Sequence, residues 1–212
     1  MATLFPPEEF AKIKDLLTVY GCGLRTVATK LDILNEDFRN FHPINPIEHI
    51  KSRIKSPESI ADKLYKKGLE LTAENARQNV YDIAGIRVIC SFTKDIHSLV
   101  EVIRKQADIT ITDEKDYVKN PKPSGYRSYH IIAEVPVYLT ASELKIPVEI
   151  QIRTEAMDFW ASLEHKVRYK YKEEIPRHLG DELIVCADKI AELDERMYLI
   201  HEIINLISNI QQ

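Results

Sequence analysis

The sequence predicts an α+β fold in which helices flank a mixed β-sheet core. Residues 5–41 and 154–210 carry apolar residues at helical spacing, whereas residues 85–153 hold most of the β-rich runs. The last two β-rich runs are separated by only a few residues, which indicates an antiparallel pair. We therefore expect one compact domain of three parts: N-terminal helices over 1–45, the sheet core over 46–175 and a C-terminal helix over 176–212.

The N-terminal region shows two helical stripes with two glycines between them. Because glycine weakens a helix, Gly21 and Gly23 predict a separation into two helices. Pro43 and Pro46 then end the helical region. The stripes consist of Phe10, Ile13, Leu16 and Leu17, followed by Leu24, Val27, Leu31, Leu34 and Phe38.

The centre alternates between β-rich and helical segments. Pro57 suits the first turn of a helix that we expect to run to about Leu69. A loop rich in Pro, Gly and Lys over 119–127 precedes the two clearest strands. In chain order, the expected elements are a short segment over 47–55, a helix over 57–69, a β-rich run over 85–91, a helix over 95–105, a β-rich run over 108–118, strands over 128–139 and 146–153, and a helix over 154–172.

The tail from Arg177 to Ile210 carries a seven-residue apolar repeat, which predicts a helix with a narrow seam. The seam packs either on the N-terminal helices of the same chain or on another subunit. We favour another subunit, because two positions in seven form a narrower stripe than a helix buried in a globular core needs. The seam consists of Leu183, Ile190, Met197 and Ile204 together with Cys186, Leu193, Ile200 and Ile207.

Composition and charge restrict the partners and the location. With 44% hydrophobic and 29% charged residues, the chain is typical of a soluble globular protein. The net charge of −4 provides no overall basic field, so RNA binding is not indicated and a polyanion site must be local. Cys22, Cys90 and Cys186 match no metal or disulfide spacing. We find no signal peptide and no run long enough to span a membrane, so we expect a cytoplasmic protein.

The strand over 146–153 places polar side chains on one face. Side chains alternate along a strand, so Glu149, Gln151 and Arg153 lie opposite their three apolar neighbours. Asp82 lies just before the β-rich run that begins at Gly85. Asp82 and Glu149 could each give a carboxylate to Mg²⁺, which takes one or two protein carboxylates together with waters and substrate phosphates. The alternative for the strand alone is a solvated polar face.

A basic cluster surrounds the start of the helix that begins at Pro57. Arg53 and Lys55 share a face if their segment is extended. Ser59 and Lys63 share a face of the helix because they lie four residues apart. The free N–H groups at the helix start favour a phosphate. Together these donors suit a triphosphate, and the alternative is a solvated basic face.

The loop over 119–130 combines basic and aromatic side chains. Lys122 and Arg127 could meet phosphates, and His130 could donate to one. Tyr126 follows a glycine, so we expect its ring to be free to stack on a base, an interaction typically worth about 1–3 kcal/mol. The alternative is a hairpin connection with tyrosines on the surface.

Asp158 is a candidate for guanine recognition, because it lies one helical turn after Thr154 and near the strand face of Glu149. Its carboxylate could accept hydrogen bonds from N1–H and the 2-amino group of guanine, a pair of donors that adenine does not present. We expect Trp160, two residues further on, to lie in the core.

Four segments, in this order, resemble the synthetase domain of the RelA/SpoT family, and the resemblance covers roughly residues 45–172. It implies a nucleotidyltransferase-like fold and the transfer of pyrophosphate from ATP to the 3′-hydroxyl of GDP or GTP. The run after Thr154 resembles the small alarmone synthetases in particular. The matching residues are Arg53, Lys55, Ser59 and Lys63, then Asp82 to Arg87, then Ser124 to His130, then Glu149, Gln151 and Arg153.

The resemblance also implies a role for each matching residue. Asp82 and Glu149 would bind Mg²⁺, and Glu149 would help to deprotonate the ribose 3′-hydroxyl. Tyr126 would stack on guanine, and Gln151 would support the substrates. The implied contacts are adenine with Arg53 and Arg87, the ATP phosphates with Lys55, Ser59 and Lys63, and the acceptor phosphates with Lys122, Arg127 and His130.

The hydrolase motif of the long family members does not precede the synthetase region, which implies synthesis only. Family members of this size are similar in being homotetramers, and the seam in the tail suits that assembly. Three alternatives are a toxic relative that pyrophosphorylates tRNA 3′ ends or adenine nucleotides, a non-catalytic nucleotide or RNA sensor, and a structural oligomeriser. The loop around Tyr126 and the carboxylate of Asp158 count against the first, and the pair Asp82 and Glu149 counts against the second.

Overall fold

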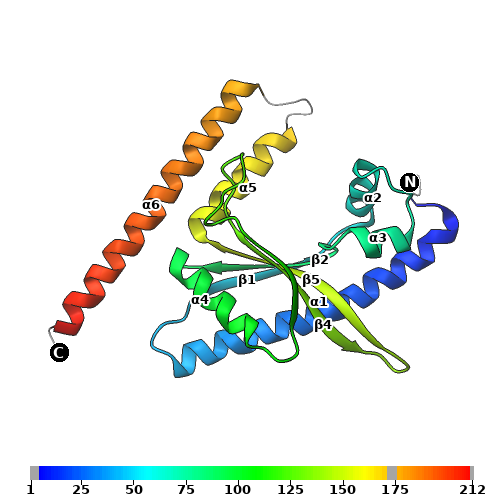
Figure 1. The fold of residues 1–212 in the computed structure, drawn as a ribbon, viewed down its shortest axis with the longest axis horizontal. Coiled ribbons are helices and arrows are strands. Elements are labelled where there is room, and N and C mark those ends of the chain that lie inside the picture. Colours follow the sequence, from blue (N-terminus) through cyan, green and yellow to red (C-terminus); the bar gives the residue numbers. More distant parts are fainter. Residues whose placement is uncertain (1–4, 171–175, 211–212) are drawn as a thin grey trace.

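The computed structural model describes residues 5–170 and 176–210, and Figure 1 shows one sheet with helices around it. This arrangement confirms the predicted α+β class. The described elements in chain order are α1 (Pro7–Phe41), β1 (Ile47–Ile54), α2 (Pro57–Lys66), α3 (Ala73–Asn79), β2 (Ala84–Cys90), α4 (Thr93–Arg104), β3 (Thr110–Asp116), β4 (Tyr129–Tyr138), β5 (Glu143–Thr154), α5 (Glu155–Lys170) and α6 (Arg177–Ile210).

The strands form one sheet in the order β1-β2-β5-β4-β3. β2 and β5 run parallel, and the other neighbouring strands run antiparallel. β4 and β5 pair from Tyr129 opposite Ile152 to Tyr138 opposite Glu143, so the predicted antiparallel pair is confirmed. β5 therefore lies at the centre of the sheet, with β2 on one side and β4 on the other.

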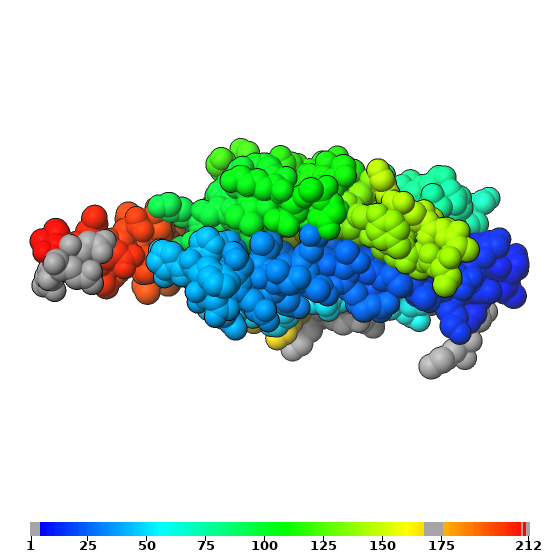
Figure 2. All heavy atoms as spheres, turned by 90° about the horizontal axis from the view of Figure 1, so that it is seen from below, coloured from blue at the N-terminus to red at the C-terminus, as the bar shows by residue number. Residues whose placement is uncertain are grey.

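One face of the sheet packs on α1 and α4. Alternate residues of the central strands, such as Ile131 of β4 and Ile150 of β5, point into this core and are fully buried beside Val27 of α1 and Leu99 of α4. Figure 2 shows α1 running along the molecule with α4 beside it. The opposite face of the central strands is left to polar side chains.

α1 is one continuous helix of 35 residues, so the predicted separation at Gly21 and Gly23 is wrong. Gly23 has a packing role instead. A Cβ atom at Gly23 would lie 2.6 Å from Cγ2 and 2.8 Å from Cβ of Ile146 in β5. The missing side chain lets α1 approach the sheet closely, and this packing outweighs the cost of glycine inside a helix, about 1 kcal/mol.

Two boundaries and one short helix differ most from the sequence prediction. α2 ends at Lys66 rather than near Leu69, because Gly68 adopts a left-handed conformation with a φ of 68°. The short helix α3, capped by Thr72, is absent from the prediction because seven residues are too few for a clear apolar stripe. β5 begins at Glu143 rather than at Ile146.

α6 packs on α5 and α4 and does not run along α1. Near its start, Leu183 and Ile190 pack on Trp160 of α5. Further along the seam, Leu193 is 59% exposed and Ile204 is 55% exposed, so the second half of the helix presents an apolar surface. None of the described helices combines the length and the apolar character that a membrane span requires.

Candidate active site

The register of β2, β5 and β4 brings predicted site residues into one row. Arg87 of β2 lies opposite Gln151 of β5, and Gln151 lies opposite His130 of β4. Gly85 lies opposite Glu149, two residues along the same strands. Directly paired residues point to the same face of a sheet, so these side chains lie together on the face away from α1 and α4.

A cavity of about 430 Å³ opens on this face, and we refer to it as the site cavity. More than half of the predicted site residues line it, which confirms that they lie together in space. The predicted residues that line it are Lys63, Asp82, Lys122, Tyr126, His130, Glu149 and Gln151. The predicted residues outside its lining are Arg53, Lys55, Ser59, Arg87, Arg127 and Asp158.

A larger groove of about 1330 Å³ lies between α1, α3 and the β4–β5 hairpin, and it meets the site cavity at Asp113 and Ile132. Six acidic and three basic side chains line the groove, so its charge disfavours polyphosphates. The site cavity instead balances three lysines against three acidic side chains and adds two aromatic rings and His130. The smaller cavity is therefore the better candidate for a nucleotide site.

Asp82 is held between two lysines. Lys55 Nζ lies 2.8 Å from Oδ2 of Asp82, and Lys63 Nζ donates to Oδ1 at 2.7 Å. Burial alone would raise the pKa of Asp82, but the two lysines outweigh burial and hold that pKa below its ordinary value. Lys55 does not line the site cavity, but its ion pair with Asp82 holds its ammonium group next to the lining. Lys55 therefore lies near Lys63, the other lysine predicted to bind the ATP phosphates.

Glu149 is the second carboxylate of the predicted pair. Its Oε1 lies 3.1 Å from His130 Nδ1, and its Oε2 accepts from Gln151 Nε2 at 2.8 Å. Burial raises the pKa of Glu149, but the contacts with His130 and Gln151 outweigh burial and the repulsion from Asp82, so the pKa lies below its ordinary value. Glu149 is therefore ionised at neutral pH and able to accept a proton or to bind a cation.

Tyr126 and Arg153 complete a closed ring of hydrogen bonds with Glu149. Arg153 Nη2 donates to the hydroxyl of Tyr126 at 2.6 Å and to Oε1 of Gln151 at 2.9 Å. Because arginine only donates, the hydroxyl of Tyr126 is left to donate to His130 Nε2, 2.8 Å away. The sequence correctly assigned Arg153 to the polar face of β5. It did not indicate that the side chain is buried, with only 5% exposed, or that it joins Tyr126 to Gln151.

The ring of Tyr126 is not free, contrary to the sequence prediction. Lys122 Nζ lies 4.9 Å and Arg153 Cζ lies 5.0 Å from its centroid, within the range of cation–π contacts. Tyr117 and His130 meet the ring edge-on. A base that stacks on Tyr126 therefore meets a ring that already has contacts with two cations.

Asp158 lies between two arginines, outside the lining of the site cavity. Its Oδ1 lies 2.9 Å from Arg87 Nη1 in an ion pair and accepts a hydrogen bond from Arg153 Nη1 at 3.1 Å. Burial lowers the pKa of Arg87, and the positive charges of Arg153 and Arg53 lower it further. Arg53 and Arg87, the two arginines predicted to bind adenine, therefore lie near each other. A guanine contact would require Asp158 to leave its arginines, so that role stays a prediction. Trp160 is buried, as expected.

The start of α2 lies beside Asp82 and keeps part of the predicted phosphate site, although the amide of Ser59 is capped by Ser56 and is not free. Segment 47–54 is strand β1, so the extended arrangement that Arg53 and Lys55 require is present. The amide of Lys55 donates to the carbonyl of Ile83 at 2.8 Å, next to Asp82. Ser59 stands in the first turn of α2, where its amide donates to Oγ of Ser56 at 3.3 Å.

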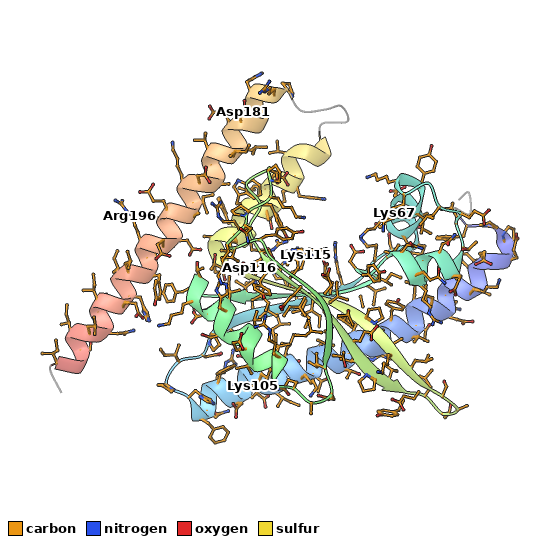
Figure 3. All side chains as sticks on the ribbon, in the orientation of Figure 1. Lys67, Lys105, Lys115, Asp116, Asp181 and Arg196 are labelled. Carbon is orange, nitrogen blue, oxygen red and sulfur yellow. The ribbon has the colours of Figure 1, made fainter. Side chains whose placement is uncertain are left out.

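Sequence reasoning missed Asp113, Lys115, Tyr117 and Ile132 of the cavity lining. The first three alternate along β3 and just beyond it, so period-two spacing within 108–118 was the available signal. Lys115 lines the site cavity, whereas its neighbour Asp116 turns toward α4 (Figure 3). Lys115 adds a cation and Tyr117 adds an aromatic ring on the side of Lys122.

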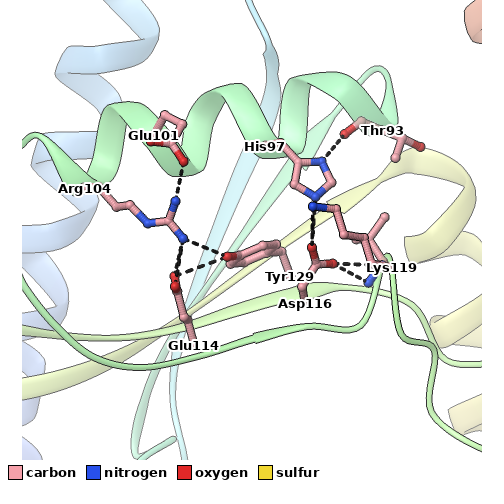
Figure 4. Close-up of polar contacts among 9 residues, drawn as sticks. Thr93, His97, Glu101, Arg104, Glu114, Asp116, Lys119 and Tyr129 are labelled. Carbon is pink, nitrogen blue, oxygen red and sulfur yellow. Dashed lines mark hydrogen bonds and ion pairs between the residues drawn. The ribbon is translucent and has the colours of Figure 1, made fainter.

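A polar network anchors the start of the loop over 119–127, which we name the basic loop (Figure 4). Oδ2 of Asp116 lies 3.1 Å from His97 Nε2 of α4, and Oδ1 accepts from the amides of Val118 and Lys119 at 3.0 and 2.9 Å. α4 therefore determines where β3 ends and the basic loop begins. A second set of contacts between α4 and the sheet joins Arg104, Glu114 and Tyr129.

The family model described as the region found in RelA / SpoT proteins matches residues 52–174. The match spans more than half of the chain and includes every residue that lines the site cavity. The chain belongs to the RelA/SpoT family. The resemblance seen in the four sequence motifs is thereby confirmed.

Two similar members of the RelA/SpoT family come from Bacillus subtilis. GTP pyrophosphokinase YwaC is 48% identical over 184 residues, which cover 87% of this chain and 88% of the relative. GTP pyrophosphokinase YjbM is 39% identical over 153 residues, which cover 72% of this chain and 71% of the relative.

Solved structures of this family share the fold. Small alarmone synthetase 2 from Bacillus subtilis matches with a TM-score of 0.81 at 46% identity, over 89% of this chain and 97% of that chain. Small alarmone synthetase 1 from the same organism, bound to its product pppGpp, matches with a TM-score of 0.84 at 34% identity, over 90% of this chain and 97% of that chain.

The two carboxylates of this RelA/SpoT-family chain fit Mg²⁺ better than a structural metal. Asp82 and Glu149 line the same cavity, and within residues 5–170 and 176–210 no cluster of three or more Asp, Glu, His or Cys side chains forms a metal site. Two protein carboxylates leave room for waters and phosphate oxygens, which is the ligand set typical of magnesium.

Proposed function

We propose that this protein transfers pyrophosphate from ATP to the 3′-hydroxyl of GDP or GTP and so makes guanosine tetra- or pentaphosphate. The observation that carries the proposal is that one cavity holds Asp82 and Glu149 beside Lys63, Lys122 and the ring of Tyr126. The relatives support this reaction, because YwaC and YjbM are named GTP pyrophosphokinases.

In the proposed reaction, the 3′-oxygen of the acceptor attacks the β-phosphorus of ATP. A bond forms between these atoms, the bond from the β-phosphorus to the oxygen bridging to the α-phosphate breaks, and AMP leaves with that electron pair. The hydroxyl proton goes to Glu149, which is ionised and oriented by His130 and Gln151. Such a transfer depends chiefly on alignment and charge neutralisation.

The donor side of the proposed site lies at β1, β2 and the start of α2. The phosphates of ATP compete with Asp82 for Lys55 and Lys63, so nucleotide binding frees the carboxylate that the ion pairs now neutralise. Adenine lies near the strand arginines, whose guanidinium planes suit stacking. The proposed donor-binding residues are Arg53, Lys55, Ser59, Lys63 and Arg87.

The acceptor side of the proposed site lies at the basic loop and β4. Guanine stacks on Tyr126 after Lys122 leaves its ring, and Lys122 is then available for the acceptor phosphates. His130 and Gln151 stand next to Glu149 and hold the ribose end of the acceptor. The proposed acceptor-binding residues are Lys122, Tyr126, Arg127, His130, Gln151 and Asp158.

Mg²⁺ is the cofactor of the proposed reaction, and Asp82 and Glu149 would hold it. When bound, this ion neutralises charge on the phosphates of ATP and on the departing AMP. The ionised state of both carboxylates, which their lowered pKa values maintain at neutral pH, suits that role.

We further propose that the protein is a cytoplasmic homo-oligomer, with a tetramer favoured. The support is the second half of α6, whose seam residues Leu193, Ile200 and Ile204 are each at least half exposed. A narrow apolar seam of this kind is typical of a helix that packs on a partner helix. Light scattering coupled to gel filtration measures the subunit number, and a monomer at micromolar concentration would contradict the proposal.

The test of the reaction is to incubate purified protein with γ-labelled ATP, Mg²⁺ and either GDP, GTP or bulk tRNA, and to separate the products. We expect the label in guanosine tetra- or pentaphosphate, with one AMP released per transfer. Glu149→Gln is the matched control, because it keeps the shape of the side chain and removes its charge. We expect it to lower turnover by about 10²- to 10⁴-fold while the fold is kept.

The other outcomes of this test identify the alternatives. Label in tRNA alone or in an adenine nucleotide would replace the proposed acceptor with that of the toxic relative. Nucleotide binding with no transfer to any acceptor would instead indicate a sensor. Turnover of Glu149→Gln within a few-fold of wild type would contradict the role assigned to that carboxylate.

A further inference from the structure

The C-terminal helix α6 lies directly against the basic loop. Gly125, in the middle of the loop, has a φ of 85°, and a Cβ atom there would lie 2.6 Å from Cβ of Ala187 and 3.5 Å from Cα of Ile184. The loop backbone therefore contacts α6 closely where Gly125 of the loop meets Ala187 of the helix. This close approach is possible because glycine has no side chain and alanine has a small one. Tyr126, the ring proposed to stack on guanine, is the next residue in the loop.

Arg127 of the basic loop points to α6 and not into the site cavity. Its Nη2 donates to Oδ1 of Asp188 at 3.3 Å, and its Nη1 donates to the carbonyl of Gly125 at 3.4 Å. The side chain of Arg127 is 20% exposed, so it is largely covered by these contacts. In this structure Arg127 thus connects the loop backbone to the helix, and the acceptor contact proposed for it requires the side chain to turn toward the site cavity.

A buried hydrogen bond joins α6 to the strand that carries Glu149. Thr154, the last residue of β5, donates from Oγ1 to Oδ2 of Asp194 at 2.6 Å, and both residues are buried. Thr154 Oγ1 also accepts from the amide of Met157 at 3.2 Å, so the same hydroxyl caps α5. Within the described ranges, Thr154 is the side chain that hydrogen-bonds Asp194, and no ion pair is found there for this carboxylate.

The contact between α6 and the loop forms a small apolar cluster that is separate from the main core. Trp160, Ala161 and Ala187 are its buried members, and Tyr126 packs on them. Trp160 Nε1 donates to the carbonyl of Leu183 at 3.0 Å, and its Cζ2 would lie 3.8 Å from a Cβ at Gly125. The ring that is proposed to meet guanine therefore packs on the same cluster that receives α6.

We propose that α6 is a positioning element of the acceptor site. Ala187, Asp188 and Asp194 hold the basic loop and the end of β5 in the arrangement that presents Tyr126 to the site cavity. The affinity for the acceptor nucleotide therefore depends on the docking of α6, whereas the contacts of this helix within the described residues lie chiefly with α5 and α4 rather than with the ATP side at β1, β2 and α2. This inference rests on the proposed function of the site cavity.

The inference connects the two halves of α6. The first half contacts the basic loop, and the second half carries the exposed seam of Leu193, Ile200 and Ile204. A partner helix that packs on the seam acts on the same rigid element that holds the loop.

The experiment measures acceptor binding separately from catalysis. Ala187→Leu places a larger side chain where the loop backbone leaves no room. Asp188→Ala removes the contact of Arg127, and Asp181→Ala is its matched control, an exposed aspartate on the same helix (Figure 3). For each variant, calorimetry gives the dissociation constants of GDP and ATP, and circular dichroism verifies folding.

Trp160 reports the docking of α6 directly, because it is the single tryptophan of the chain and lies in the contact. We expect Ala187→Leu to shift its emission to longer wavelength and to weaken GDP binding by about tenfold or more. We expect Asp188→Ala to weaken GDP binding by about two- to fivefold. The ATP dissociation constant should stay within about twofold in both variants, and Asp181→Ala should change neither nucleotide.

A second pair of variants tests the buried hydrogen bond. Asp194→Asn keeps an oxygen that accepts from Thr154, whereas Asp194→Leu loses it. We expect Asp194→Asn to bind GDP within about threefold of wild type and Asp194→Leu to bind it about tenfold more weakly. Equal GDP affinity in these two variants would contradict the role of that hydrogen bond.

The outcomes separate this inference from the proposed function. A shift of Trp160 emission in Ala187→Leu with unchanged GDP affinity would overturn the inference while transferase activity stands. Wild-type protein that binds GDP without transferring pyrophosphate would overturn the proposed function, and the loss of GDP affinity in the variants would still support the positioning role. Wild-type protein that does not bind GDP would overturn both.

Discussion

Alanine at Gly23 should destabilise the protein, whereas alanine at Gly21, two residues earlier in the same helix, should stabilise it. Both glycines lie inside α1, where a change from glycine to alanine gains about 1 kcal/mol in helix propensity. At Gly21 the new Cβ would meet only Nη1 of Arg25 at 3.8 Å, the end of a flexible side chain. Gly21→Ala therefore keeps the whole gain.

At Gly23 the new Cβ would lie 2.6 Å from Cγ2 and 2.8 Å from Cβ of Ile146. Rotation of the Ile146 side chain moves its Cγ2 but not its Cβ, so α1 or β5 has to shift. Overpacking of this kind costs about 1–3 kcal/mol. After the gain in helix propensity is subtracted, Gly23→Ala should lose up to about 2 kcal/mol of stability.

Thermal unfolding, followed by circular dichroism, measures the difference between the two variants. A chain of this size changes its melting temperature by about 2–4 °C for each kcal/mol. Gly21→Ala should therefore melt about 2–4 °C above wild type, and Gly23→Ala up to about 8 °C below it. Equal melting temperatures would refute the argument that close packing on β5 explains why α1 tolerates Gly23.

Three further predictions concern the site. Tyr126→Ala should raise the KM for the acceptor about 5- to 150-fold, because base stacking is typically worth about 1–3 kcal/mol; an unchanged KM in steady-state kinetics would count against stacking. Arg153→Lys should lower the free energy of unfolding in urea by about 1–3 kcal/mol, because one ammonium cannot replace its contacts with Tyr126, Gln151 and Asp158; a loss below about 0.5 kcal/mol would contradict its joining role. The lowered pKa of Asp82 contributes stability that is present above its unfolded pKa of about 3.9 and is lost as pH falls through the folded pKa. Wild type should therefore lose stability more steeply than Asp82→Asn below about pH 4, and parallel curves would contradict the pairing with the two lysines.

Local spacing predicted the face of the strand that carries Glu149 and Gln151, because alternation along a strand is a property of neighbouring residues. The same reasoning could have found Lys115 and Tyr117, which alternate in the β-rich run over 108–118. Their cavity role went unnoticed because the run is polar on both faces and shows no apolar contrast. Local patterns therefore identify a site face only where one face is clearly apolar.

Arg127 and Asp158 have partners in this structure that local spacing did not predict. Both lie near the predicted acceptor residues in the sequence, yet Arg127 turns to Asp188 of α6 and Asp158 turns to Arg87 and Arg153. The direction of a charged side chain in a loop or at a helix start depends on which opposite charge the fold brings near it. Asp188 is distant from Arg127 in the sequence, and Arg87 is distant from Asp158. Only Arg153 lies close to its partner, Asp158, along the chain.

The sequence by itself determined the α+β class, the family and most of the residues of the site cavity, because motif order and strand alternation are local properties that survive without coordinates. Only the tertiary structure decided that α1 is continuous, that Arg153 joins Tyr126 to Gln151, and that α6 rests on the basic loop. Each of these depends on contacts between residues far apart in the chain, and such contacts follow from strand register and helix packing, which no window of neighbouring residues contains.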